Sequence, residues 1–151
     1  MNRYIRTKIN FTKDPERIKQ ITEELGETFD FTRIIPLNEN EDPFEKWGSG
    51  SGPEEQDLIV YQNGTKAEYT FDTLKSAPLR IYEKLAERYP DVQLKISYAS
   101  EDYGNDCGSY EAIEGKLQAL ELEDPFVFAC DVWEVDPEEQ AIEEMINYYE
   151  E

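Results

Sequence analysis

Residues 78–98 read PLRIYEKLAERYPDVQLKISY, and this stretch predicts a helix followed by a strand. Apolar residues recur at helical spacing after Pro78, and Pro90 prevents the helix from continuing. Val92–Tyr98 then alternates apolar with polar residues, as a half-buried strand does. A helix that leads directly into such a strand predicts helices packed on a sheet.

The N-terminal part of the chain predicts a similar unit. Residues 4–11 carry apolar side chains in a period-two pattern, which indicates a strand. Asp14 suits the cap of a helix whose first residue is Pro15, and Gly26 stops that helix. Residues 28–37 are rich in aromatic and β-branched side chains, so they predict a second strand followed by a loop.

The middle of the chain predicts a loop and then a hairpin. Residues 38–57 hold seven acids, one lysine, two prolines and a run of glycine and serine, which favours flexible coil. Residues 58–62 and 65–72 flank Asn63-Gly64, the pair that best tolerates the positive φ angles of a tight hairpin turn. We therefore expect two paired strands here.

The C-terminal part predicts another hairpin and two helices. Residues 110–113 and 116–122 can pair across a turn at Glu114-Gly115. Residues 125–134 fit either a short helix or a strand, and we favour the helix. Asp136 should cap a last helix. This helix has an apolar stripe made of Ala141, Ile142, Met145, Ile146 and Tyr149.

The order of these elements predicts an α+β fold. We expect a ferredoxin-like sandwich with helices on one face of a mainly antiparallel sheet, plus an extra C-terminal strand and helix. A chain of 151 residues fits one domain, residues 1–151. Within it, residues 1–122 would form the ferredoxin-like core with a mobile loop at 38–57, and residues 123–151 an acidic helical extension.

Several stretches resemble a known family. They are Phe29–Pro36 (FDFTRIIP), Trp47-Gly48, and residues 69–90 (YTFDTLKSAPLRIYEKLAERYP) running into Val92–Tyr98. Over about residues 3–120 the chain resembles the YubB-type ferredoxin-like domain found in proteins of bacterial plasmids and phages. The resemblance implies the ferredoxin-like fold and a bacterial cytoplasmic setting. It brings no catalytic signature.

Negative charge is concentrated at one end of the chain. The net charge is −20, and residues 99–151 hold 17 acids with Lys116 as the single base. Such a chain repels phosphate backbones, so direct binding to nucleic acid or to anionic membranes is disfavoured and a basic partner is favoured. The sequence contains no apolar stretch long enough to span a bilayer, which indicates a cytoplasmic protein.

The residue types limit the chemistry. The chain has no histidine, which excludes Ser-His and Cys-His nucleophilic sites and histidine metal ligands. Cys107 and Cys130 lack metal-ligand spacing and are expected to be reduced thiols, and we expect no cofactor. Asp102, Asn105 and Asp106 could offer oxygen ligands to Ca²⁺ or Mg²⁺, although a solvated acidic turn is favoured.

The leading hypothesis is a non-enzymatic protein that binds a basic partner surface through its acidic C-terminal third. By analogy, charge of this kind could act as a DNA mimic that inhibits a host nucleic-acid-binding or defence protein. The alternatives are a small carboxylate- or metal-dependent enzyme and a self-associating structural protein. The expected electrostatic residues are Glu134, Asp136, Glu138, Glu139, Glu143 and Glu144, with Trp133 and Tyr149 as anchors.

Overall fold

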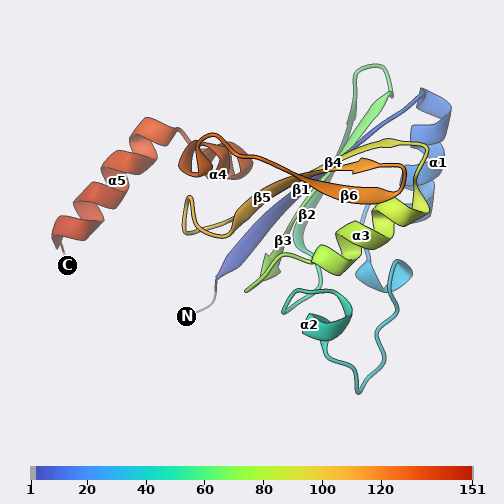
Figure 1. Ribbon diagram of the computed structural model, residues 1–151, viewed down its shortest axis with the longest axis horizontal. Helices are drawn as coiled ribbons and strands as arrows, with labels where there is room; N and C mark the ends of the chain where they lie inside the picture. The colour runs from blue at the N-terminus through green and yellow to red at the C-terminus, as the bar shows by residue number, and fades with distance from the viewer. Residues whose placement is uncertain (1–2, 151) are drawn as a thin grey trace.

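The computed structural model describes residues 3–150 and contains one six-stranded antiparallel sheet (Figure 1). Met1, Asn2 and Glu151 of the predicted 1–151 domain lie outside the described residues. The strands lie in the order β2-β3-β1-β4-β5-β6. Their bounds are β1 (Tyr4–Thr12), β2 (Glu54–Tyr61), β3 (Lys66–Leu74), β4 (Gln93–Ser100), β5 (Cys107–Ile113) and β6 (Lys116–Leu120), and the α-helices are α1 (Pro15–Leu25), α2 (Pro43–Lys46), α3 (Leu79–Arg88), α4 (Pro125–Trp133) and α5 (Pro137–Glu150).

The predicted fold class is confirmed. Two successive strand–helix–strand units, one through α1 and one through α3, place their strands in the spatial order β2-β3-β1-β4. This α+β arrangement is that of a ferredoxin-like sandwich. The β5–β6 hairpin, predicted across Glu114-Gly115, then extends the sheet beyond β4.

Strand β1 lies in the interior of the sheet and has two different faces. Its ladder with β3 runs from Tyr4 to Thr12, and its ladder with β4 covers nearly the same length. Ile5, Ile9 and Phe11 are fully buried on one face, beneath α1 and α3. Arg6 and Lys8 point to the other face, because successive side chains of a strand alternate.

Helix α4 packs on the face of the sheet opposite α1 and α3. Its Ala129 and Val132 form a small separate apolar cluster with Ala99 of β4. Ala99 lies between Tyr98 and Ser100, so it faces away from the main core. The helix favoured for residues 125–134 is therefore confirmed, and it covers part of the second face.

The second strand predicted over residues 28–37 is wrong. Phe31–Arg33 instead form a short 3₁₀ helix, and the Asp30 side chain accepts a hydrogen bond from the Thr32 backbone N–H (2.9 Å). In a strand, Phe31 and Ile34 would point to opposite faces, but a 3₁₀ turn places residues three apart on the same side. Both side chains are buried as a result.

The coil predicted over residues 38–57 is also only partly correct. It contains α2 and the first residues of β2. Hydrogen bonds hold the glycine-rich part against the body, since Gly50 N–H donates to the Leu74 carbonyl (2.9 Å) and Trp47 Nε1 to the Ile35 carbonyl (2.9 Å). At Gly48, φ is +93° and an added Cβ would lie 3.0 Å from the Leu79 nitrogen, so a larger residue would be strained. The mobility of this loop stays a prediction.

Buried tyrosines give the fold a defined response to alkaline pH. Burial raises the pKa of Tyr82, whose hydroxyl is hydrogen-bonded to Thr7, well above the usual value. Burial also raises the pKa of Tyr69 and of Tyr98. Unfolded tyrosine has a pKa of about 10, so above that pH the unfolded state loses protons that the folded state keeps. Stability is then unaffected by these groups below pH 10 and falls above it.

We therefore expect the melting temperature, followed by circular dichroism, to fall as pH rises through about 10 to 12. Phenolate absorbance of the buried tyrosines should appear together with unfolding. In Tyr98→Phe, one such group is removed and the fall should be shallower. Complete tyrosine ionisation with the folded circular dichroism spectrum retained would contradict the prediction.

Candidate functional site

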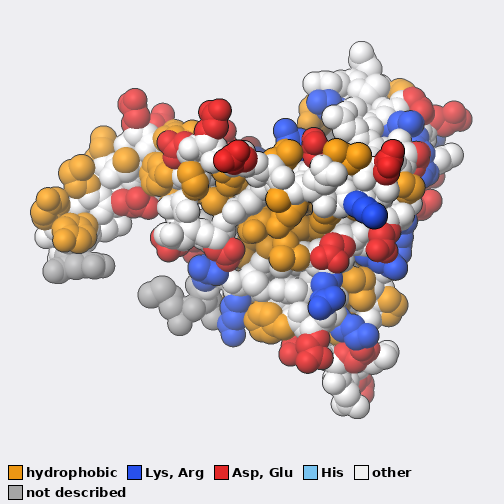
Figure 2. All heavy atoms as spheres, viewed as in Figure 1, with side chains coloured by type: hydrophobic (Ala, Val, Ile, Leu, Met, Phe, Trp, Pro, Cys, Tyr) orange, Lys and Arg blue, Asp and Glu red, His pale blue; other side chains and the backbone are white. Residues whose placement is uncertain are grey.

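Helix α5 extends away from the rest of the molecule (Figure 1), and the space-filling view shows apolar and acidic side chains along it (Figure 2). None of residues 137–150 is buried, and residues 141–150 are all exposed. Within the described chain, α5 therefore lacks the core packing that holds most helices. It is available as a surface for another molecule.

The start of α5 is stabilised by its own cap. The Asp136 Oδ1 atom accepts hydrogen bonds from the backbone N–H groups of Glu138 (2.8 Å) and Glu139 (3.3 Å). The two acidic residues also lie near the positive end of the helix dipole, which favours negative charge. The predicted capping role of Asp136 is confirmed, and its Oδ1 atom is engaged in the cap.

The acids predicted as partner-binding residues divide into two groups. Glu138, Glu139, Glu143 and Glu144 are exposed on α5, which contains no lysine or arginine. The Glu134 carboxylate lies 3.5 Å from Lys8 Nζ, although its side chain remains 72% exposed. The structure therefore places four of the predicted acids together on one free helix. Tyr149, a predicted anchor, is exposed on the same helix.

Trp133, the other predicted anchor, contacts the protein's own sheet. Its indole Nε1 donates to the carbonyls of Ala99 (3.0 Å) and Ser100 (3.1 Å) in β4. The Arg6 guanidinium lies over the ring, 4.3 Å from its centroid, at a distance typical of cation–π contacts. These contacts attach the end of α4 to the sheet.

Arg6 connects this attachment to the neighbouring strand. Arg6 forms a bidentate ion pair with Asp72 of β3: its Nε donates to Oδ1 (2.8 Å) and its Nη2 donates to Oδ2 (3.2 Å). The hydrogen bonds to Asp72 raise the pKa of Arg6. The sequence did not predict that Arg6 contacts Trp133 or that Lys8 pairs with Glu134. The place of Arg6 and Lys8 at alternate polar positions of β1 signalled exposure on the second face, but not that α4 would pack there.

The residues considered for metal binding make hydrogen bonds within the protein. Asp106 Oδ2 accepts a hydrogen bond from Arg3 Nη2 (2.7 Å), while Asp102 Oδ2 accepts one from Asn105 Nδ2 (3.0 Å). Across residues 3–150, no group of three or more His, Cys, Asp or Glu side chains is placed to hold a metal ion. The solvated acidic turn stays a prediction. Cys107 and Cys130 are free thiols, and burial raises the pKa of both.

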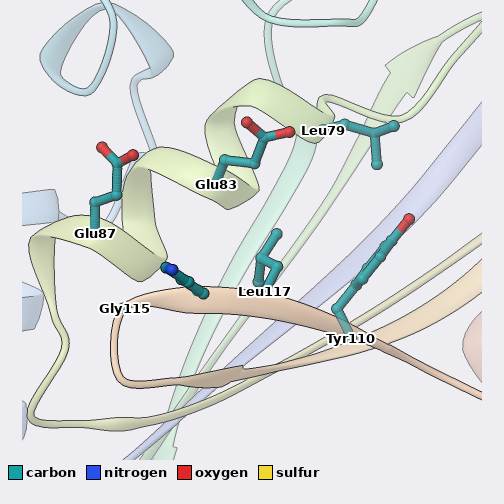
Figure 3. A pocket seen from close by; sticks show the side chains of 7 residues that line it. Leu79, Glu83, Glu87, Tyr110, Gly115 and Leu117 are labelled. Carbon is teal, nitrogen blue, oxygen red and sulfur yellow. The ribbon is translucent and has the colours of Figure 1, made fainter.

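A groove of about 340 Å³ lies between α3 and the β5–β6 hairpin (Figure 3). Tyr110 and Leu117 rise from the sheet toward α3, while Glu83 and Glu87 lie on the helix. The groove has an apolar floor, and its rim carries both the acids Glu83 and Glu87 and the base Lys116.

The match to known families follows the C-terminal two thirds of this architecture. Residues 54–149 match a family model described as the ferredoxin-like domain in Api92-like protein. No curated protein and no solved structure matches the chain. The matched region includes α4 and nearly all of α5. Within the part of the chain that the structure describes, none of the helices combines the length and apolar character needed to cross a bilayer.

The contacts of Trp133 predict a structural effect on substitution. Trp133→Ala removes the ring beneath Arg6 and both indole hydrogen bonds, so we expect about 3 kcal/mol of destabilisation. Trp133→Phe keeps most of the packing but leaves the bonds to Ala99 and Ser100 unmade, which should cost about 1 kcal/mol. Urea denaturation measures both values. Stability equal to wild type in the alanine variant would contradict the assigned attachment.

Because no group of three or more His, Cys, Asp or Glu side chains is placed to hold a metal among residues 3–150, we predict no response to divalent cations. Adding Ca²⁺ or Mg²⁺ at millimolar concentration should leave the melting temperature unchanged, because a ligand stabilises only a state that binds it. Differential scanning fluorimetry checks this outcome. A rise in melting temperature that disappears in both Asp102→Ala and Asp106→Ala would establish the metal site instead.

Proposed function

The chain belongs to the family of ferredoxin-like domains in Api92-like proteins, and from the site that this domain carries we propose that it is a non-enzymatic protein that binds a basic surface of a partner protein. The binding element is the acidic C-terminal third, and within it α5. The observation that carries the proposal is a helix with no buried residue, no basic residue and several exposed carboxylates.

Electrostatics supports this choice of partner. The C-terminal third holds 17 acids and one base, so its field attracts a positively charged protein over a range of about a Debye length. Complementary charge of this kind accelerates association and excludes partners of the wrong sign.

The narrower form of the proposal is mimicry of DNA. In this form, the protein acts in the bacterial cytoplasm as part of a plasmid or phage, in line with its resemblance to YubB-type domains, and inhibits a host nucleic-acid-binding or defence protein. Carboxylates four residues apart on α5 are separated by about 6 Å along the helix axis. This spacing is sparser than the phosphates of a DNA strand, which lie about 3.4 Å apart along the axis. A mimic would therefore also need acids outside α5.

Neutralising the acids of α5 tests the proposal. Glu138, Glu139, Glu143 and Glu144 are replaced together by Gln, which removes four charges and leaves the Asp136 cap and the Glu134–Lys8 ion pair in place. Affinity capture from a bacterial lysate, read by mass spectrometry, should retain a basic protein on the wild type and lose it with the variant. Its retention should weaken with added salt. If the partner is one that DNA mimicry would target, duplex DNA should displace it.

A matched variant controls for net charge. Glu16, Glu23, Glu27 and Glu39 are exposed and lie away from α5, so replacing them by Gln gives the same total charge. This variant should retain the partner as the wild type does. Equal retention by the α5 variant and the wild type would reject the proposal, and equal loss in both variants would show that net charge alone is responsible.

A further inference from the structure

The apolar side chains of α5 form one exposed stripe. Ile142, Met145, Ile146 and Tyr149 follow the spacing i, i+3, i+4 and i+7, which places them on one side of an α-helix. They are 57%, 59%, 50% and 78% exposed, respectively. A helix in a stable domain normally buries such a face, so this one is left open to another molecule.

The charges around the stripe are arranged unequally. At about 100° per residue, Glu139, Glu143 and Glu150 fall along one edge of the stripe. Glu138 lies in line with the stripe one turn before Ile142, and Glu144 lies on the opposite side of the helix. The opposite edge carries Ala141 and Tyr148, which are uncharged. A surface that complements α5 would therefore be apolar in the middle and basic along one side.

We infer that α5 is a recognition helix that inserts Ile142, Met145, Ile146 and Tyr149 into an apolar groove of a partner protein that carries Lys or Arg along one rim. This inference rests on the proposed function and adds how the partner is bound. In this mode the apolar stripe supplies most of the affinity, while the carboxylates select and orient the partner.

A second copy of the chain fits the stripe poorly. Two copies would bring their acidic C-terminal thirds together, and like charges that face each other across an interface disfavour association. A membrane surface fits no better, because helices that lie on anionic lipids carry Lys or Arg on their polar face and α5 has neither.

Photo-cross-linking tests the inference. The photoreactive residue p-benzoylphenylalanine replaces Met145 on the stripe or, as the matched control, Asn147 on the opposite side of α5. The full-length protein is irradiated in bacterial lysate, and the adducts are mapped by mass spectrometry. We expect an adduct from position 145 and none from position 147. The linked partner peptide should lie in an apolar groove with Lys or Arg at its rim.

A second pair of variants separates the inference from the proposed function. Ile142→Gln with Ile146→Gln keeps helix propensity and should weaken binding of the captured partner by about 100-fold, because two apolar contacts are lost. The melting temperature should not change, since neither residue is buried. Unchanged affinity here, with affinity lost in the glutamate variant, would overturn the inference and leave the proposed function standing.

Several other cross-linking products would contradict the inference. An adduct to a second copy of the chain, to the chain's own body, or to lipid in vesicles of phosphatidylglycerol and phosphatidylcholine would overturn the inference. Equal adducts from positions 145 and 147, or none from either, would do the same. If the glutamate variant also binds like the wild type, the proposed function fails as well.

Discussion

Strand β1 is paired along its length on both sides, and its two faces determine where the other elements pack. The apolar face, with Ile5, Ile9 and Phe11, accepts α1 and α3 and so forms the main core. The polar face carries Arg6 and Lys8, whose contacts with Trp133 and Glu134 hold the end of α4. The direction in which α5 leaves the molecule depends on that attachment. One interior strand thus links the core of the fold to the position of its candidate binding helix.

The elements that local physics specifies were predictable from sequence. Asp14 with Pro15 marked the start of α1, and Asn63-Gly64 marked the β2–β3 turn, where both residues adopt positive φ. Phe31 and its neighbours misled the prediction, because their aromatic and β-branched character suits a strand as well as any buried segment. What buried them was a tertiary contact, the packing of Phe31 against Trp47 and Phe71, which lie far away in the chain.

In the candidate site, too, local features were predictable from sequence and tertiary contacts were not. The acids of α5 and its apolar stripe could be read from spacing alone, and the helix is where it was predicted. Sequence spacing does not reveal whether an amphipathic helix packs on its own domain, because that depends on the surface left free by the other elements. Helix α4 occupies part of the second face of the sheet, and α5 begins beyond it. The sequence predicted both Trp133 and Tyr149 as aromatic anchors for a partner. In the structure, Trp133 is bonded to β4 of its own sheet, whereas Tyr149 is exposed on α5.

The isolation of α5 has a consequence for how such a protein can change over generations. Residues 141–150 make no buried contact, so substitutions there carry little folding penalty. In the proposed function, the affinity of α5 for its partner can therefore change without compensating changes in the core. The α4 attachment holds the start of the helix while its outward side chains vary. Folding stability and the proposed binding surface thus reside in different parts of the molecule.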